Sequence, residues 1–175
     1  MLECIYFFVI GAFLGWMLEC VFKAMSGHTD RTPGILNTPF CILYGIGTVV
    51  LSLVINRVTN NFILLFILSM VVLTVMEYLT FVLLKDIYNI KLWDYSDMKF
   101  KLNEKVCLEF SLIWGVLGTL YIKFILPVLS KFFYVAAGAA LVTSLYIIFA
   151  IIFIDFVISS VKLIKEKEAY VDINE

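Results

Sequence analysis

Long uninterrupted stretches of apolar residues, separated by short polar segments, dominate the pattern along this chain. A helix needs about 20 apolar residues to cross the hydrocarbon core of a bilayer, whereas a membrane β-strand alternates apolar and polar positions. Because the stretches do not alternate, the pattern predicts an all-α, polytopic membrane helical bundle. Five transmembrane helices are predicted, at about residues 2–23, 39–55, 62–84, 106–127 and 132–161.

Composition agrees with this pattern and limits the classes of function. Of the 175 residues 15% are charged, well below the roughly 25% of a soluble domain. Residues 1–161 are predicted to form a single transmembrane domain, and residues 162–175 a charged cytoplasmic tail that extends the fifth helix. No basic stripe suggests a nucleic-acid partner. The single histidine, His28, and four scattered cysteines predict no metal site and no cofactor.

The basic residues are distributed unequally between the two sides of the predicted bundle. Ten of the 13 Lys and Arg residues lie on one side of the predicted bundle. This side contains the segments that follow the first, third and fifth helices. The positive-inside rule therefore predicts an N-terminus outside the cell and a C-terminus in the cytoplasm. The lysines between residues 85 and 105 would face anionic headgroups, so membrane lipids are predicted partners.

Glu77 is the most informative single residue, because it lies inside an apolar stretch of membrane-spanning length. A carboxylate at that position needs a partner, a proton or a water-filled cavity. No basic residue lies within one helical turn of it. Whatever satisfies Glu77 must therefore come from elsewhere in the fold or from a ligand.

Three further acids, Glu19, Glu109 and Asp155, lie at comparable positions in three other predicted helices. With a rise of about 1.5 Å per residue, all four lie roughly 5–12 Å from the cytoplasmic boundary. This shared depth predicts a hydrated acidic pocket that opens to the cytoplasm. A structural alternative remains open, since Glu19 can pair with Lys23 and Glu109 with Lys105 at a spacing of four residues.

Two polar segments on the predicted cytoplasmic side carry candidate residues. Asn37 and Asn103 precede helices, where they can cap free N–H groups, and the same helix N-termini can bind an anion or a carboxylate such as Glu77. Trp93 and Tyr95 are typical interfacial anchors. Asp94 between them is predicted to cap a helix or to turn inward to a basic residue.

A short repeat, LNxxxC, opens the second predicted helix at residues 36–41 and the fourth at residues 102–107. Each of these helices then carries an aromatic–glycine step, Tyr44-Gly45 and Trp114-Gly115. The repeat predicts two parallel helical hairpins followed by a fifth helix. Internal repeats of this kind are common in transporters.

Several of these motifs together resemble a known bacterial family of integral membrane proteins, putative ABC-transporter type IV (CmpB-like). The motifs are Gly15-Trp16…Glu19, Pro39…Tyr44-Gly45, Glu77-Tyr78, Trp93-Asp94-Tyr95-Ser96, Asn103…Cys107 and Trp114-Gly115. The resemblance implies a location in the bacterial inner membrane and a role in transport.

The chain departs from the family pattern at three places. It has Leu92 where the family has a first Trp, Asn103-Glu104-Lys105 for Asn-Gly-Arg, and Pro33-Gly34 for Arg-Gly. If the arginines of the family bind an anion, Arg31 and Lys105 are the residues of this chain that would replace them. The chain also lacks a Walker GxxxxGK[ST] loop, so transport driven by ATP would need an ATPase or another membrane subunit as partner.

The sequence thus predicts a transport component that binds a polar or cationic solute, or a lipid headgroup, in the acidic pocket. The alternatives are an intramembrane enzyme acting on a lipid-linked substrate through paired carboxylates, and a non-catalytic regulatory or assembly subunit. The enzyme is less favoured, because no nucleophile constellation is present. The predicted binding residues are Glu19, Glu77, Asp94, Asn103 and Glu109, supported by Trp16, Asn37, Tyr44, Trp93, Tyr95, Trp114 and Asp155.

Overall fold

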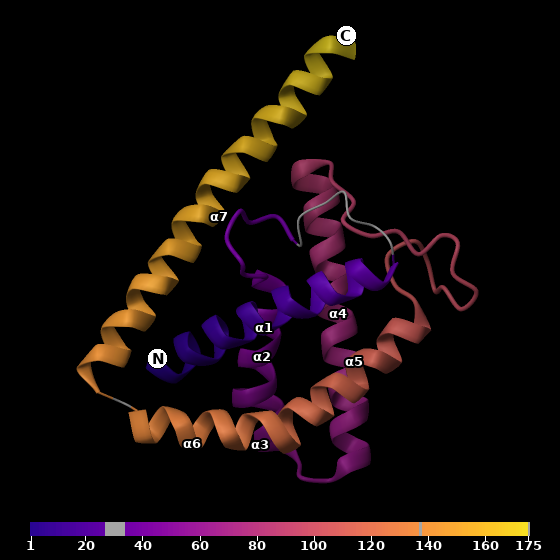
Figure 1. Cartoon of the computed structure of the whole chain (residues 1–175). Helices are drawn as coiled ribbons and strands as arrows, with labels where there is room; N and C mark the ends of the chain where they lie inside the picture. The colour runs from indigo at the N-terminus through magenta and orange to yellow at the C-terminus, as the bar shows by residue number, and fades with distance from the viewer. Residues whose placement is uncertain (27–33, 137, 175) are drawn as a thin grey trace.

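The computed structural model describes residues 1–26, 34–136 and 138–174, and these segments are mostly helical (Figure 1). The elements are α1 (Leu2–Ser26), α2 (Ile42–Val50), η1 (Leu51–Ile55), α3 (Asn56–Val58), α4 (Phe62–Tyr88), α5 (Leu108–Leu120), η2 (Tyr121–Ile125), α6 (Leu126–Ala136) and α7 (Ala139–Asn174), where η denotes a π-helical segment. The predicted all-α class is confirmed for these segments. His28 and Arg31 lie outside the described residues.

Four helices are long and apolar enough to cross a membrane: Leu2–Met25, Phe62–Tyr88, Leu108–Ala136 and Ala139–Lys167. The predicted multi-pass membrane protein is therefore confirmed. A shorter apolar helix, Ile42–Val58, comprises α2, η1 and α3. Its length of about 17 residues is at the lower limit for a span, so the fifth crossing stays a prediction.

The boundary between the last two long helices differs from the prediction. Instead of turning between residues 127 and 132, the chain stays helical through Pro127 to Ala136. A proline lacks an N–H and crowds the carbonyl of the preceding turn, and the widened turn of the adjacent η2 makes room for it. The chain turns at Gly138, whose N–H donates to the Ala136 carbonyl at 2.7 Å, and α7 begins at Ala139.

The chain up to Ala136 contains the same unit twice, α1–α2–η1–α3 and α4–α5–η2–α6. Within each unit the long first helix packs along the second, and the second helix has a cysteine as its N-cap, Cys41 or Cys107. The two π-helical segments meet, because the Tyr121 hydroxyl donates to Ser52 Oγ at 2.9 Å while Ser52 donates to the Thr48 carbonyl. The structure thus has the predicted two hairpins and a further helix.

That further helix, α7, contacts α1 and α4 and extends beyond the other helices at its C-terminal end (Figure 1). It continues as a helix through residues 162–174, the segment expected to form the charged tail. The buried apolar core joins both hairpins to α7, through residues such as Phe7, Leu51, Phe133 and Ile152. Many large apolar side chains elsewhere are exposed, as expected for residues that face lipid tails.

Close approach of α1 and α2 depends on glycine. A Cβ added to Gly15 would lie 2.1 Å from Cγ of Tyr44, and one added to Gly11 would lie 1.9 Å from Thr48 Oγ1. The position of the Tyr44 ring is therefore set by the absence of a side chain at residue 15.

We expect Gly15→Ala to displace the Tyr44 ring and to destabilise the protein by about 1–3 kcal/mol, the usual cost of overpacking. The measurement is the thermal unfolding midpoint of the purified protein in detergent. Gly47→Ala is the milder control, because its nearest neighbour is the flexible end of Leu73 at 3.2 Å. An unchanged midpoint for Gly15→Ala would show that the two helices are not in this contact.

Candidate functional site

Glu77 is buried inside the bundle, with 3% of its surface exposed. Its Oε1 accepts a hydrogen bond from the Tyr95 hydroxyl at 2.8 Å, and its Oε2 accepts one from Trp114 Nε1 at 3.1 Å. Tyr95 comes from the segment between α4 and α5, and Trp114 comes from α5. The partners therefore come from elsewhere in the fold, and both are neutral groups.

A second glutamate is bound in the same way in the first hairpin. Glu19 of α1 accepts a hydrogen bond from the Tyr44 hydroxyl of α2 at 2.7 Å. The Tyr44 and Trp114 rings meet edge to face, with centroids 5.5 Å apart. Each hairpin thus pairs a glutamate of its long helix with an aromatic residue of the next helix. We call Glu19, Glu77, Tyr44, Trp114 and Tyr95 the two-glutamate cluster.

Tyr95 is turned into the protein rather than toward the membrane interface. Its ring stacks on Phe110 at 4.9 Å between centroids, and its N–H donates to the Glu104 carbonyl at 3.0 Å. The neighbouring Trp93 donates through Nε1 to the Lys105 carbonyl at 3.2 Å. Sequence reasoning did not single out Phe110, although its place one helical turn before Trp114 puts it on the same face of α5.

Charged residues hold the segment between α4 and α5 in place. Lys85 and Lys91 bind the Glu104 carboxylate at 3.0 and 2.8 Å, and Lys91 also pairs with Asp94 at 3.3 Å. Hydrogen bonds from Ser96, helped by Lys91, lower the pKa of Asp94 to about 2. Bonds from Lys91 and Lys85 lower the pKa of Glu104 as well. Asp94 is therefore ionised at neutral pH and organises this segment, and it makes no bond to the two-glutamate cluster among the described residues.

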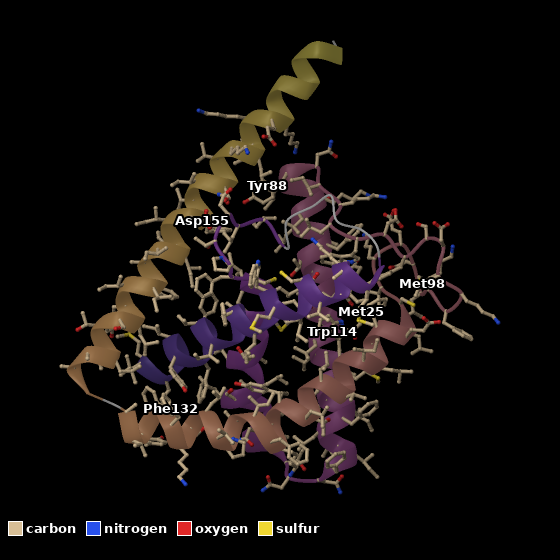
Figure 2. All side chains as sticks on the ribbon, in the orientation of Figure 1. Met25, Tyr88, Met98, Trp114, Phe132 and Asp155 are labelled. Carbon is tan, nitrogen blue, oxygen red and sulfur yellow. The ribbon has the colours of Figure 1, made fainter. Side chains whose placement is uncertain are left out.

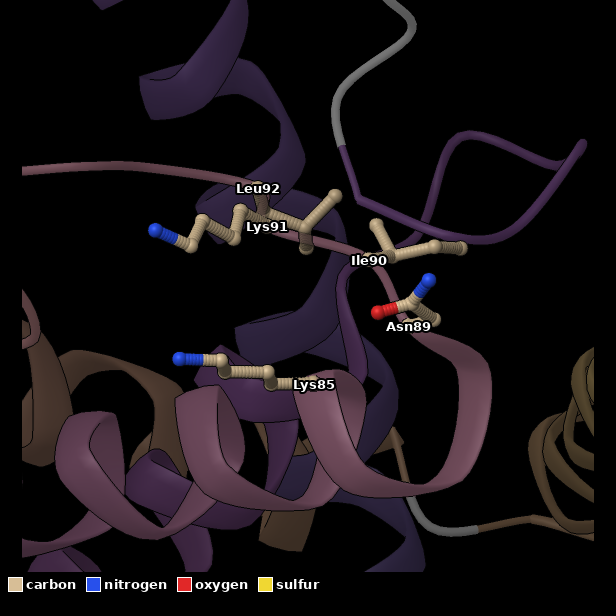
Figure 3. A pocket seen from close by; sticks show the side chains of 5 residues that line it. All are labelled: Lys85, Asn89, Ile90, Lys91 and Leu92. Atoms are coloured by element: carbon tan, nitrogen blue, oxygen red, sulfur yellow. The ribbon is translucent and has the colours of Figure 1, made fainter. Parts of the chain in front are cut away.

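An open hollow of about 550 Å³ lies beside these charges (Figure 3). Two ammonium groups reach along it, yet Glu104 and Asp94 compensate their charge. The C-terminal end of α4, where the hollow begins, also carries the negative end of the helix dipole. The hollow therefore offers an anion little net attraction. It is lined by Lys85, Asn89, Ile90, Lys91 and Leu92.

Asp155 of α7 is bound in a separate network (Figure 2). Its Oδ1 accepts from Asn37 Nδ2 at 2.8 Å and from Ser159 Oγ at 3.3 Å. Its Oδ2 accepts from Thr38 N at 2.7 Å and from Thr38 Oγ1 at 2.6 Å. Four donors match the roughly four acceptor sites of an ionised carboxylate, so Asp155 is satisfied by the protein alone. It joins α7 to the segment before α2.

The other predicted site residues stand apart from the cluster. Glu109 is exposed in the first turn of α5, where the helix dipole favours its charge. Asn103 is exposed, and its Oδ1 accepts from the N–H groups of Lys105 and Val106 at 2.9 and 3.0 Å. Trp16 is half-buried and stacks on a neighbouring ring of its own helix. Of the four intramembrane acids, the described contacts thus link only Glu19 and Glu77, through the ring contact between their partners Tyr44 and Trp114.

Comparison with known proteins assigns the chain to a family. The family model described as putative ABC-transporter type IV matches residues 6–160, which include nearly all of the first hairpin, the whole second hairpin and most of the membrane-spanning part of α7. The chain belongs to this family and is a multi-pass membrane protein related to transport. No curated protein and no solved structure matches it. The match includes every residue of the two-glutamate cluster.

Removing the Asp155 carboxylate would leave the N–H and the hydroxyl of Thr38 without an acceptor, whereas the Asn37 amide would keep Ser159 Oγ at 2.9 Å. We therefore expect Asp155→Ala to destabilise the protein by about 1–3 kcal/mol. Asp155→Asn keeps one acceptor oxygen and should cost less. Thermal unfolding in detergent measures both, and equal midpoints for Asp155→Ala and the unchanged protein would contradict a structural role.

Proposed function

We propose that the protein is a transport component that binds a small cationic solute at the two-glutamate cluster. The observation that carries this proposal is the set of partners of Glu77: a buried carboxylate that receives hydrogen bonds from two neutral donors. An ionised carboxylate has about four acceptor sites, so the two donors found among the described residues leave Glu77 able to accept more. Burying it without a counter-charge is costly, and a bound cation or proton removes that cost.

The rings around the two glutamates favour an organic cation over a bare ion. Tyr44 and Trp114 lie between the acids, and aromatic faces attract ammonium groups, most strongly where water is excluded. A polar lipid headgroup that carries an ammonium group has the same chemistry. Paired carboxylates would also suit an enzyme, but both oxygens of Glu77 face aromatic donors rather than a second acid.

We further propose that all five helices cross the membrane and that the cluster faces the cytoplasm. The ten-to-three distribution of basic residues supports this orientation. If Ile42–Val58 crosses the membrane, the C-terminal ends of α1 and α4 lie on one side of it. The N-terminal ends of α2 and α5 then lie on that same side. A partner such as an ATPase would then meet the segment at residues 89–107 or the end of α7.

Replacing Glu77 tests the proposed binding site. In the purified protein, we expect Glu77→Gln and Glu77→Ala to weaken binding of tetramethylammonium at least tenfold, because the negative charge is lost. Isothermal titration measures the affinity. Glu3→Gln is a matched control, since Glu3 also accepts from a tyrosine, Tyr134, at 2.6 Å, but on an exposed surface. Affinity unchanged by either Glu77 variant would rule out this site.

Cysteine labelling tests the orientation. In a background whose four native cysteines are alanine, we expect Asn60→Cys to react with an impermeant maleimide on intact cells. Asp97→Cys should react only after the membrane is opened. Both positions are exposed in the structure. The reverse pattern would mean either that Ile42–Val58 does not cross or that the whole bundle is inverted.

A further inference from the structure

A half-open cavity of about 120 Å³ lies between the two hairpins, with walls from α1, α2, η1, α4, α5 and η2. Tyr44 and Trp114 belong to the wall, so the cavity adjoins the two-glutamate cluster. The Tyr44 hydroxyl donates to Glu19 at 2.7 Å, and Trp114 Nε1 donates to Glu77 at 3.1 Å. The wall includes Leu14, Gly47, Leu73, Leu117, Tyr44 and Trp114.

The polar side chains in this wall offer no free group to the cavity. Thr48 donates to the Phe7 carbonyl at 2.9 Å, and Tyr121 bonds Ser52 at 2.9 Å. The hydroxyl and N–H groups of the two aromatic residues go to the glutamates. The wall is therefore apolar in effect. Apolar walls of this kind suit an apolar group, as in an enclosed apolar cavity of about 150 Å³ that binds benzene.

We propose that this cavity and the two-glutamate cluster form one binding site for a hydrophobic ammonium compound, with a single ring or short alkyl group. This proposal rests on the proposed function above and adds the class of substrate. The apolar group fills the cavity, and the ammonium lies against the Tyr44 and Trp114 rings. Hydrogen bonds to carboxylates make these rings more electron-rich, which strengthens their attraction for a cation.

The size of the cavity separates two sources of this chemistry. A volume of about 120 Å³ holds one ring, so an aminophospholipid would have to leave both of its acyl chains outside the cavity. The walls are also held in place by glycine contacts, since a Cβ at Gly118 would lie 2.5 Å from Cβ of Ser69. The site is therefore assigned to a small solute rather than to a membrane lipid.

Three probes separate the two parts of the site in the purified full-length protein. Benzyltrimethylammonium has the ring and the charge, tetramethylammonium has only the charge, and benzyl alcohol has only the ring. By isothermal titration, we expect benzyltrimethylammonium to bind at least tenfold more tightly than either of the others, because ring burial adds to the attraction for the charge. Equal affinities for the two cations would overturn the role of the cavity.

Leu73→Phe fills the cavity from α4 and should weaken benzyltrimethylammonium binding about tenfold, while leaving tetramethylammonium binding unchanged. Leu79→Phe is the matched control, since Leu79 lies on the same helix but is exposed. If Leu73→Phe does not fold, Gly47→Ala adds one methyl group beside Leu73 and should weaken binding about threefold. Wild-type affinity for the ringed probe in the folded variants would contradict the proposal.

The outcomes distinguish this inference from the proposed function. If Glu77→Gln weakens tetramethylammonium binding but cavity variants change nothing, the cation site stands and the assigned substrate class is wrong. If Glu77→Gln changes nothing, both are wrong. Adding phosphatidylethanolamine to the micelles should leave benzyltrimethylammonium binding unchanged, and competition by this lipid would overturn the assignment to a small solute.

Discussion

The buried carboxylate of Glu77, which accepts hydrogen bonds from two neutral donors, is the constraint on which the arrangement of the second hairpin depends. An unsatisfied carboxylate in this position would cost several kcal/mol, so the fold must deliver its partners reliably. Trp114 reaches Glu77 because α5 packs closely along α4. Tyr95 reaches it only because the segment after α4 folds back against the helices. The lysine and glutamate pairs at Lys85, Lys91 and Glu104 hold that segment in place.

Asp155 shows why a lone acid in an apolar stretch does not by itself indicate a binding site. In the sequence it looks like Glu77, since neither acid has a basic residue nearby. In the structure Asp155 receives four hydrogen bonds, two of them from Thr38, 117 residues away. Glu77 receives two. The number of hydrogen-bond donors that reach an acid from distant parts of the chain distinguishes a structural acid from one that can accept a ligand. The sequence around the acid does not reveal this number.

Other features follow the sequence more closely. The apolar stretches predicted the long helices, and the LNxxxC repeat predicted two hairpins whose second helices begin after Cys41 and Cys107. The turn expected near Pro127 is absent because the π-helical η2 accommodates the proline, and such a local widening leaves no mark in hydropathy. Tyrosine is a typical interfacial anchor, so the sequence alone suggests that role for Tyr95. Its stacking on Phe110 shows that it points into the protein instead.

The repeated hairpins give the cluster its geometry and also its asymmetry. Each hairpin supplies one glutamate bound to one aromatic residue, and the two halves meet at the Tyr44–Trp114 contact and at the Ser52–Tyr121 hydrogen bond. Within the part of the chain that the structure describes, only Glu77 has a second donor, Tyr95, and Glu19 is more exposed. Because the rings that touch across the boundary are also the donors to the acids, relative movement of the two hairpins must change the surroundings of both carboxylates. The packing of one hairpin against the other therefore affects the environment of the Glu19 and Glu77 charges, and a change in either carboxylate affects that packing.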